Sequence, residues 1–317
     1  MMDLLVTVLS TAFLATVVRT TTPLLLATLG GVVADLSGAL NVALEGIMLV
    51  GGLAAVLVSV HTPWPIAVLA ALGAGGLLGA LMAFFHLRLK ANVILVGLAI
   101  NILASGGTVY VLSLATGGDK GSSTNLISKA VPALDLSALT RVPLIGATLA
   151  AVLSGHSVLS WLAACLVAAL WYLLHRMPQG LWIRAVGEYP AAPAAAGIDV
   201  DKVRAWSLII SGALAGLGGA QLAMFNYVGF ARDMTAGRGF IALGAVLLGA
   251  RHPVGALGAA LLFGLFEALS VTIPNFFAWV PPELIQMIPF VVTFLVLIAF
   301  SPRLIGNRGL SVLRTGS

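Results

Sequence analysis

Charged residues and cysteine are what this sequence has least of. Only 9% of its 317 residues are charged while 60% are hydrophobic, and the mean hydropathy is +1.09. A soluble domain carries about 25% charged residues, so a soluble globular fold is excluded. The single cysteine, Cys165, excludes a disulfide within the chain and a cysteine metal site. Its place inside an apolar run predicts a packed, inert thiol.

Motifs that bind phosphate or metal are also missing. The chain has no G-x-x-x-x-G-K-[ST] phosphate loop and no Gly-Lys dipeptide, so it does not hydrolyse ATP through that cradle. No nucleophile, metal cluster or acid–base pair is evident, which makes a membrane enzyme the least favoured function class, and no cofactor is predicted. The five histidines stand at loop edges or span ends without ligand spacing, and we interpret them as interface residues: His61, His86, His156, His175 and His252.

Long apolar runs fill the sequence instead. A helix that crosses a hydrocarbon core of roughly 30 Å needs about 20 apolar residues. We expect an all-α, polytopic helical membrane protein with about 8–10 transmembrane segments in one domain, residues 1–317. The first run follows Asp3 rather than a basic region, so we read it as a retained helix and not as a signal peptide. The candidate spans are 4–18, 21–36, 38–60, 65–86, 92–115, 157–175, 205–228, 239–250 (too short to cross alone), 255–272 and 284–300.

The order of these spans indicates an internal repeat. Segments 4–115 and 157–300 each hold five apolar stretches in the same order, and an odd number of crossings separates their starts. The second segment is therefore expected to be an inverted copy of the first, with an external loop at about 116–156 and a cytoplasmic loop at about 176–204. This orientation takes the basic tail as cytoplasmic, and it places most of the Lys and Arg residues on that side.

In both halves the third stretch is interrupted by small and polar residues. The two stretches are "SGALNVALEGIMLVGG" (37–52) and "TAGRGFIALGAVLLGARHP" (235–253). Paired, glycine-broken segments at corresponding positions indicate a substrate site near the bilayer midplane, because unwound backbone offers hydrogen bonds there. Close helix packing is the alternative explanation. It is the one we adopt for Gly212, Gly216 and Ala220, which repeat every four residues.

Two carboxylates stand inside the spans, Glu45 and Glu267. Each costs about 2.5–3.5 kcal/mol on insertion scales, so each is expected to face the protein interior or a cavity. Asn41 shares a helix face with Glu45 if that stretch is helical, and the two are then candidates for binding a polar solute. Alternatively, Glu45 accepts backbone N–H groups that a broken helix leaves free. For Glu267 we favour a structural role, because no second polar residue accompanies it at helical spacing.

Other polar and aromatic residues extend the candidate site. Asn101, Gln221 and Asn226 are interpreted as interhelical hydrogen-bonding residues first and ligand contacts second. Phe225 and Phe240 are able to stack on a planar ring or to lie at the membrane interface. The predicted substrate path is Asn41, Glu45, Phe225, Asn226 and Phe240.

Three stretches carry a resemblance to a known family. "LWIRAVGEYPAAPAAAGIDVDKVRAWSLIISGALAGLGGA" (181–220) resembles the cytoplasmic loop and following helix of membrane permeases of ATP-binding-cassette importers for nucleosides, simple sugars and branched-chain amino acids. "SGALNVALEGIMLVGG" is similar to the N-I-G-x-E-G-x-M pattern of the nucleoside permeases that work with basic-membrane-protein-type lipoproteins. "GRGFIALGAVLLGARHPVGALGAALLFG" is similar to their G-x-G-F-I-A-L-A signature. Tyr189 and Ala43 depart from the family, which usually has Asn and Gly there.

The resemblance implies a permease subunit that forms the path for a nucleoside or related polar solute while a separate ATPase supplies the energy. Residues 188–197 would be the coupling helix that docks in the ATPase, and Gly197 is predicted to end it with a left-handed cap. The residues assigned to coupling are Gly187, Glu188, Pro190, Ala194, Ala195 and Gly197.

The partners implied are the ATPase, a second permease subunit (a paralogue or a second copy), an extracytoplasmic solute-binding lipoprotein and membrane lipid, with no nucleic acid. The implied location is the bacterial plasma membrane. A permease for simple sugars or branched-chain amino acids is the alternative. A secondary transporter is a further rival, but it would be expected to carry coupling carboxylates at the midplane, where only Glu45 and Glu267 are available.

Overall fold

The computed structural model describes residues 10–123, 126, 128–135, 154–276 and scattered positions between 284 and 298. Its long helices are α2 (Thr11–Leu36), α3 (Leu44–His61), α4 (Trp64–Ala83), α5 (Val93–Thr116), α7 (Val158–Arg176), α10 (Val200–Gln221) and α12 (Pro253–Thr272). The shorter elements are α8 (Pro178–Glu188), α9 (Ala191–Ala195), α11 (Arg238–Leu248), the π-helical turns η1 (Phe84–Arg88) and η3 (Leu222–Asn226), and the 3₁₀ turn η4 (Ile273–Asn275). Strands β1 (Ala133–Leu134) and β2 (His156–Ser157) form one short antiparallel pair.

Within this described part, seven helices are long and apolar enough to cross a membrane, with η1 extending α4 and η3 extending α10. This confirms the polytopic helical membrane protein that the sequence predicts. α11 has 11 residues and is too short to cross alone, as expected. The span predicted at 284–300 and the basic tail lie outside the described residues, apart from scattered positions.

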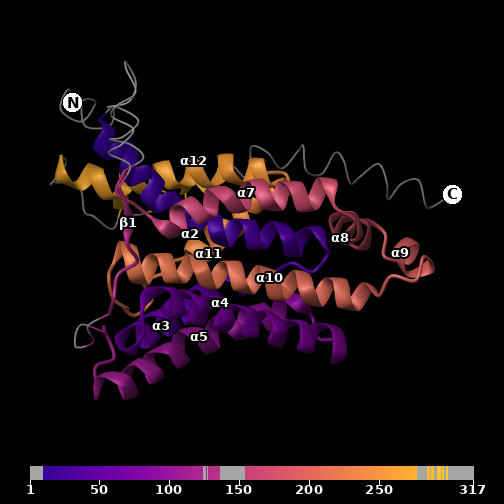
Figure 1. Ribbon diagram of the computed structural model, residues 1–317, viewed down its shortest axis with the longest axis horizontal. Coiled ribbons are helices and arrows are strands. Elements are labelled where there is room, and N and C mark those ends of the chain that lie inside the picture. Colours follow the sequence, from indigo (N-terminus) through magenta and orange to yellow (C-terminus); the bar gives the residue numbers. More distant parts are fainter. Residues whose placement is uncertain are drawn as a thin grey trace.

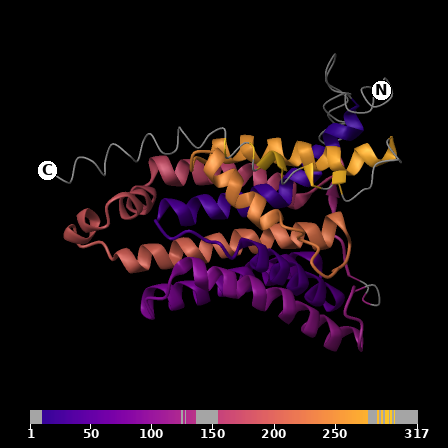
Figure 2. The ribbon, with the colours of Figure 1, turned by 180° about the vertical axis from the view of Figure 1, so that it is seen from behind.

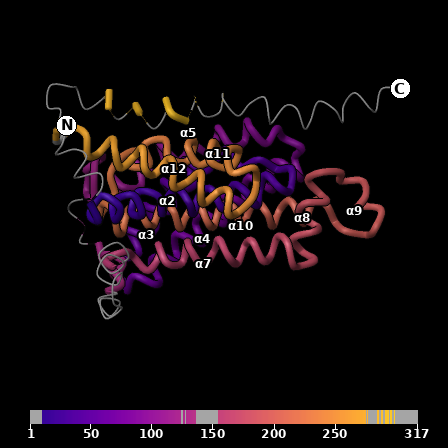
Figure 3. Tube along the Cα trace, turned by 90° about the horizontal axis from the view of Figure 1, so that it is seen from above, coloured from indigo at the N-terminus to yellow at the C-terminus, as the bar shows by residue number. Residues whose placement is uncertain are grey.

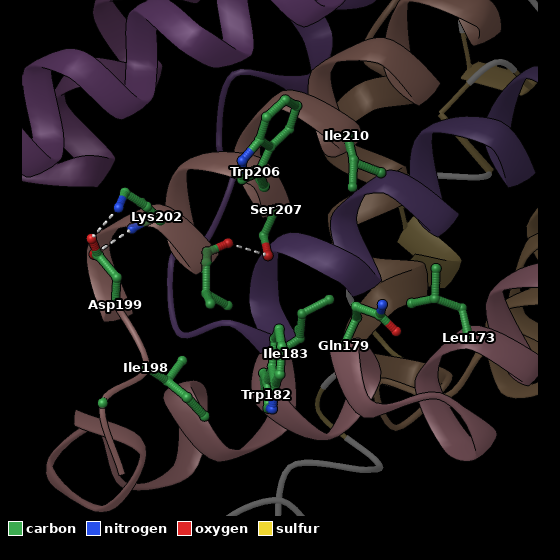
Figure 4. A pocket seen from close by; sticks show the side chains of 12 residues that line it. Leu173, Gln179, Trp182, Ile183, Ile198, Asp199, Lys202, Trp206, Ser207 and Ile210 are labelled. Carbon is green, nitrogen blue, oxygen red and sulfur yellow. Dashed lines mark hydrogen bonds and ion pairs between the residues drawn. The ribbon is translucent and has the colours of Figure 1, made fainter. Parts of the chain in front are cut away.

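The long helices run along the long axis of the molecule, with β1 at one end and α8 and α9 projecting at the other (Figure 1). Figure 2 shows this order from behind, with α12 in yellow on one side of the molecule and α4 and α5 in purple on the other. In the view from above, α8 and α9 again lie beyond the ends of the long helices (Figure 3). α10 and α2 are the most buried of the spans and α5 and α7 the least, so the core lies around α2 and α10.

The sequence predicted two spans, 4–18 and 21–36, but the described residues 11–36 form one helix; residues 4–9 lie outside the described part of the chain. α2 instead continues without a break through Pro23. The hydroxyl groups of Thr20 and Thr22 donate to carbonyl oxygens one turn earlier in the same helix, at 3.1 and 2.8 Å. A membrane helix tolerates proline and polar residues of this kind because hydroxyls and neighbouring helices satisfy the backbone groups. The Thr-Thr-Thr-Pro tract therefore stays helical.

α4 and α10 approach each other backbone to backbone. A Cβ atom on Gly75 would overlap the carbonyl of Gly212, and one on Gly212 would overlap the carbonyl of Gly75. Gly216 meets the backbone of Ala71 in the same way one turn further along. Small residues allow such approaches in lipid, where apolar burial alone does not drive helices together. The packing role predicted for Gly212 and Gly216 is confirmed.

Cys165 is exposed on α7, so the prediction of a packed thiol is wrong. The prediction assumed that an apolar run is buried in protein. Lipid chains are as apolar as a protein core, and the outward face of a peripheral span such as α7 meets lipid instead.

Candidate functional site: the junction of α3 and α11

The chain leaves the helical conformation between α2 and α3, at residues 37–43. Asn41 lies in this loop and is fully buried. Its Oδ1 accepts the N–H of Ala43 at 3.0 Å, and its Nδ2 donates to Oγ of Ser211 on α10 at 2.9 Å. Because α3 begins only at Leu44, the stretch that holds Asn41 is not helical, and the condition for Asn41 and Glu45 to share a helix face is not met. Asn41 instead fastens the loop to α10.

Asn101 of α5 holds the start of α3 from the other side. Its Oδ1 accepts the N–H of Gly46 at 2.8 Å, and its Nδ2 donates to the carbonyl of Val42 at 2.9 Å. The first N–H groups of a helix have no partner within it, so Asn101 satisfies one of them. The interhelical hydrogen bond predicted for Asn101 is confirmed.

Glu45 joins the two glycine-broken segments. Its Oε1 accepts the N–H of Gly237 at 2.8 Å, and its Oε2 accepts the N–H of Gly239 at 2.6 Å. A Cβ atom on Gly239 would overlap the backbone of Glu45, so the first turns of α3 and α11 are in direct contact. The alternative interpretation of Glu45 was that it accepts N–H groups left free by a broken helix. Glu45 does accept such groups, but they belong to the other half of the chain.

Electrostatics explains why a carboxylate stands here. A helix N-terminus carries about half a positive charge, and α3 and α11 bring two of them together. Glu45 places one negative charge between them and binds two N–H groups of the segment that starts α11. We define this contact of Glu45, Gly237 and Gly239 as the α3–α11 junction.

A buried ion pair lies beside the junction. Nε of Arg238, the first residue of α11, donates to Oε1 of Glu267 on α12 at 2.7 Å, and both side chains are more than 85% buried. The same guanidinium donates to the carbonyl of Met234 at 3.0 Å and to the hydroxyl of Tyr227 at 3.2 Å. Glu267 therefore has a polar partner that helical spacing within its own span could not reveal. The pair with Arg238 supports the structural role that the sequence favoured for Glu267.

Phe225 and Asn226 lie together at a different place. Pro23 has no N–H, so the carbonyl of Arg19, four residues earlier, loses its helical partner. Nδ2 of Asn226 donates to that carbonyl at 3.4 Å, and the guanidinium of Arg19 lies 5.2 Å from the centre of the Phe225 ring. These two predicted path residues fasten η3 to α2, and their polar contacts are with Arg19. Phe240 lies in α11 next to the junction and is 46% exposed.

The segment predicted as a single coupling helix, 188–197, is divided in two. Glu188 is the last residue of α8, Tyr189 is not helical (φ −148°, ψ 88°), and Pro190 precedes the first residue of α9. A proline disfavours the helical conformation in the residue before it, which ends α8 at this point. One continuous helix over this segment is therefore a wrong prediction.

The end of α9 is as predicted. Gly197 has a left-handed conformation with φ of 82°. The N–H groups of Gly197 and Ile198 donate to the carbonyls of Ala194 and Pro193 at 3.0 and 2.9 Å, which is the Schellman pattern. Ala194 is exposed on the projecting helix, as is its neighbour Ala195 (Figure 1).

Gly187 has a different environment from the exposed alanines. A Cβ atom there would overlap the carbonyl of Leu36, and its Cα would lie 3.3 Å from a Cβ placed on Gly38. Arg204 of α10 donates through Nε to the carbonyl of Ser37 at 3.3 Å. The loop that leads to Asn41 is thus held between α8 and α10, and α8 contacts it directly.

Comparison with known proteins identifies the family of this fold. Residues 13–297 match the family described as branched-chain amino acid transport system / permease component. The chain belongs to this permease family. It is a multi-pass protein of the plasma membrane. No solved structure matches it.

Several curated relatives of this permease cover most of its length. It is 35% identical over 291 residues to the guanosine ABC transporter permease protein NupQ of Bacillus subtilis, which covers 89% of each chain. It is 32% identical over 302 residues to the nucleoside ABC transporter permease protein NupC of Lactococcus lactis, which covers 90% of this chain and 91% of the relative. The putative glucose ABC transporter permease protein TsgC13 of Haloferax volcanii is 33% identical over 256 residues, 80% of this chain and 75% of the relative. The permease is therefore of the ATP-binding-cassette importer type.

Sequence reasoning about this permease missed two residues of the junction region. Arg238 was not named as a candidate, although it starts α11 and its side chain is only 14% exposed. Ser211, which accepts a hydrogen bond from Asn41, was not named as a candidate either. The arginine between Gly237 and Gly239 was a usable signal, because a charge inside a glycine-broken apolar segment needs a counter-charge in the membrane. Ser211 offered no such signal.

Proposed function

We propose that this permease forms the translocation path of an importer for nucleosides. The observation that carries the proposal is the similarity, over about nine-tenths of both chains, to permeases named for guanosine and for nucleosides. The relative named for glucose covers less of both chains, which leaves simple sugars as the second candidate class. Branched-chain amino acids are third, because the relative named for them matches only 33% of this chain.

The ATPase docks at the end of the bundle that carries α8 and α9. Support comes from the exposed alanines of α9, its rigid Schellman end and its position beyond the long helices (Figure 3). A solute-binding lipoprotein delivers the nucleoside at the opposite end, and a second permease subunit, a paralogue or a second copy, completes the pathway. Membrane lipid surrounds the remaining apolar faces.

The helices form two inverted repeats, with α2, α3 and α4 corresponding to α10, α11 and α12. α2 runs from the β1 end toward α8, whereas α10 runs from α9 toward the β1 end (Figure 1). Gly75 of α4 packs against the backbone of α10, and Gly264 of α12 packs against Thr21 of α2 in the corresponding way. The two repeats meet where α3 and α11 begin, so the α3–α11 junction is the pivot between them.

The path residues act in two ways. Asn41 and Glu45 shape the path by holding the loop and the junction. Phe225 and Asn226 hold its wall where η3 meets Arg19 of α2. Phe240 has an exposed ring beside the junction and can stack on a nucleobase, since aromatic faces pair in offset or edge arrangements.

Uptake of radiolabelled guanosine tests this function. In cells that depend on this system, uptake should be lost when the chain is deleted and restored when it is supplied on a plasmid. It should also be lost when the phosphate-loop lysine of the ATPase is replaced, because that residue contacts the nucleotide phosphates. A protonophore should leave the uptake rate unchanged over the first minutes.

Two results would contradict the proposal. Uptake that survives the ATPase substitution and collapses with the protonophore would indicate a secondary transporter. Competition by unlabelled glucose or leucine, with none by unlabelled adenosine or inosine, would move the substrate to one of the other two classes.

A further inference from the structure

A polar cavity lies where α2, α7 and α8 meet the turn between α11 and α12. It encloses about 260 Å³, which is below the roughly 300 Å³ at which pockets for drug-sized ligands begin, so it suits a small ion or a head group and not a nucleoside. The apolar part of its wall is Leu36, Gly187 and Ala250. The polar part is His175, Arg184, Glu188, Arg251 and His252.

Two charged side chains of this cavity, Arg184 and Glu188 of α8, have no polar partner among the described residues, and Arg184 is the less exposed of the two. The Nε atom of Arg184 is hidden from solvent and has no hydrogen-bonding partner. Within the described residues its guanidinium makes neither a hydrogen bond nor an ion pair. A guanidinium carries five N–H donors in a fork that fits carboxylate or phosphate oxygens. An unpaired guanidinium beside a cavity can therefore bind an anion there.

Arg251 brings a second guanidinium to the cavity, and it is positioned by strained backbone. Ala250 and Arg251 both have left-handed conformations, with φ of 53° and 60°. Such conformations cost about 1–3 kcal/mol each outside glycine and persist where the surrounding structure holds them. Arg251 binds Asp35 through Nε and Nη2 at 2.6 and 3.1 Å. The carboxylate of Asp35 is therefore paired with Arg251. Glu188, the carboxylate on the cavity wall, is exposed to solvent.

The two histidine rings complete the cavity, with centroids 4.8 Å apart. Nδ1 of His252 accepts the N–H of Val254 at 3.2 Å, so its hydrogen is on Nε2, which is free to donate. Nδ1 of His175 faces the carbonyl of Trp171 at 3.0 Å and must donate to it, so Nε2 of the neutral ring is an acceptor. Burial and then the neighbouring His175 lower the pKa of His252.

Metal binding does not explain this arrangement. No group of three or more His, Cys, Asp or Glu side chains gathers anywhere in the described part of the chain. The cavity offers donors instead: one unpaired guanidinium, one guanidinium shared with Asp35 and the Nε2–H of His252. It also lies at the N-terminus of the 20-residue helix α12, where a negative charge is stabilised.

We propose that this cavity is a binding site for a phosphate group, with Arg184 as its main contact and Arg251 and His252 as its second and third. The group belongs either to a free phosphate ion or phosphomonoester or to the head group of an anionic phospholipid. Because Gly187 and Leu36 form part of the wall, the bound group holds α8 against α2 and α12 and restrains the segment that leads to α9. The site stands on its own geometry and does not depend on which solute the permease carries.

The test uses the full-length chain purified in a neutral detergent, with inorganic phosphate as the probe and chloride at matched ionic strength as the reference. Phosphate should raise the melting temperature in a saturable way, since a ligand that binds only the folded state stabilises it. Arg184→Gln should weaken the apparent affinity at least about tenfold, because a hydrogen bond to a charged group contributes about 1.5–3 kcal/mol. Arg176→Gln is the matched control: it removes an exposed arginine at the end of α7, two residues before α8 begins, and should leave the affinity unchanged.

A second arm separates the two sources of the phosphate group. The same variants are reconstituted in nanodiscs of neutral lipid or of neutral lipid with phosphatidylglycerol, and their melting temperatures are compared. A shift with phosphatidylglycerol that Arg184→Gln removes, without a response to free phosphate, assigns the site to a lipid head group. The opposite pattern assigns it to a soluble phosphate.

Other outcomes overturn the proposal. If neither probe stabilises the unmodified chain, the cavity binds no phosphate group. If Arg184→Gln and Arg176→Gln reduce the phosphate-induced rise in melting temperature equally, the rise comes from the general surface charge of the protein and not from this cavity. Should Arg184→Gln fail to fold, Arg184→Lys replaces it: this variant keeps the positive charge but loses the planar guanidinium fork, so it should weaken the response to phosphate while Arg176→Gln does not.

Discussion

At the scale of single residues, Glu45 shows how a carboxylate is accommodated in a membrane span. Insertion of the charge costs about 2.5–3.5 kcal/mol. Each of its hydrogen bonds to an N–H group contributes about 1.5–3 kcal/mol because the acceptor is charged, so the two bonds to Gly237 and Gly239 offset that cost. The dipoles of α3 and α11 add to the balance. The carboxylate is therefore stable where it stands without binding a solute.

We predict that Glu45→Gln lowers the stability of the permease by about 1–3 kcal/mol. The amide keeps one acceptor oxygen but turns an NH₂ group toward a backbone N–H, and it removes the charge between the two helix starts. The thermal midpoint of the purified chain should fall and guanosine uptake should fall with it.

Glu188→Gln is the control for the thermal midpoint only, because Glu188 is also one of the residues predicted to act in coupling. It neutralises an exposed carboxylate at the end of α8, and surface changes of this kind usually stay within about 0.5 kcal/mol. If Glu45→Gln abolished uptake with an unchanged midpoint, Glu45 would be a solute contact and the junction would hold without it.

At the scale of elements, α9 is too short to be stable by itself. Isolated helices below about 12 residues are marginal in water, and α9 has five. Its shape comes from both ends: Pro190 precedes its first residue, and Gly197 closes the last turn with the Schellman bonds. Pro193 is buried, which leaves Ala194 and Ala195 on the exposed side. The helix is a fixed, small-residue surface.

We predict that Ala195→Trp prevents docking of the ATPase. If α9 fits a groove, an indole in place of a methyl group overpacks it at a cost of about 1–3 kcal/mol, and Ala194→Trp should act alike. The variants should reach the membrane in normal amounts but should no longer co-purify with the ATPase or stimulate its turnover.

Lys90→Trp provides the comparison. Lys90 is exposed at the same end of the bundle, where it lies 3.9 Å from Asp201 at the start of α10. This variant should keep its ATPase. Equal co-purification of all three variants would show α9 to be an ordinary solvated connection and would remove the structural support for an importer.

At the scale of the whole molecule, glycine contacts decide how the spans assemble. Gly75 and Gly212 meet across α4 and α10 with no room for a Cβ atom on either side. Between helices in lipid, association is driven by packing and hydrogen bonding. If two backbones can no longer approach closely, apolar burial elsewhere does not replace the lost packing energy. The core around α10 therefore depends on a few positions without side chains.

We predict that Gly75→Ala destabilises the permease by about 1–3 kcal/mol, because the new methyl group meets the backbone of α10 and not a movable side chain. Gly73→Ala, in the same helix, has nothing within 4 Å of the added atom. It should be neutral or stabilising by up to about 1 kcal/mol, since alanine is the better helix former. Thermal unfolding of the two variants checks the difference, and equal midpoints would show that α4 and α10 are not packed as described.

Local patterns in the sequence were enough to predict the class of the protein and several of its details. Hydropathy identified the spans, the four-residue spacing of Gly212 and Gly216 identified a packing face, and Gly197 identified the end of α9. Each of these depends on a residue and its near neighbours in the chain. The same local reasoning placed a break before Pro23, where the hydroxyls of neighbouring threonines keep α2 helical.

Only the tertiary structure decided what the charged and polar residues do. Glu45 binds N–H groups nearly 200 residues away, and a backbone N–H has no signature in the sequence. Glu267 pairs with Arg238 across two helices, and Asn226 donates to a carbonyl that Pro23 leaves free. Hydropathy and capping are local properties, whereas the partner of a buried polar group depends on which helices pack together. That choice is made by backbone contacts such as those of Gly75 and Gly212, which form only when the whole bundle does.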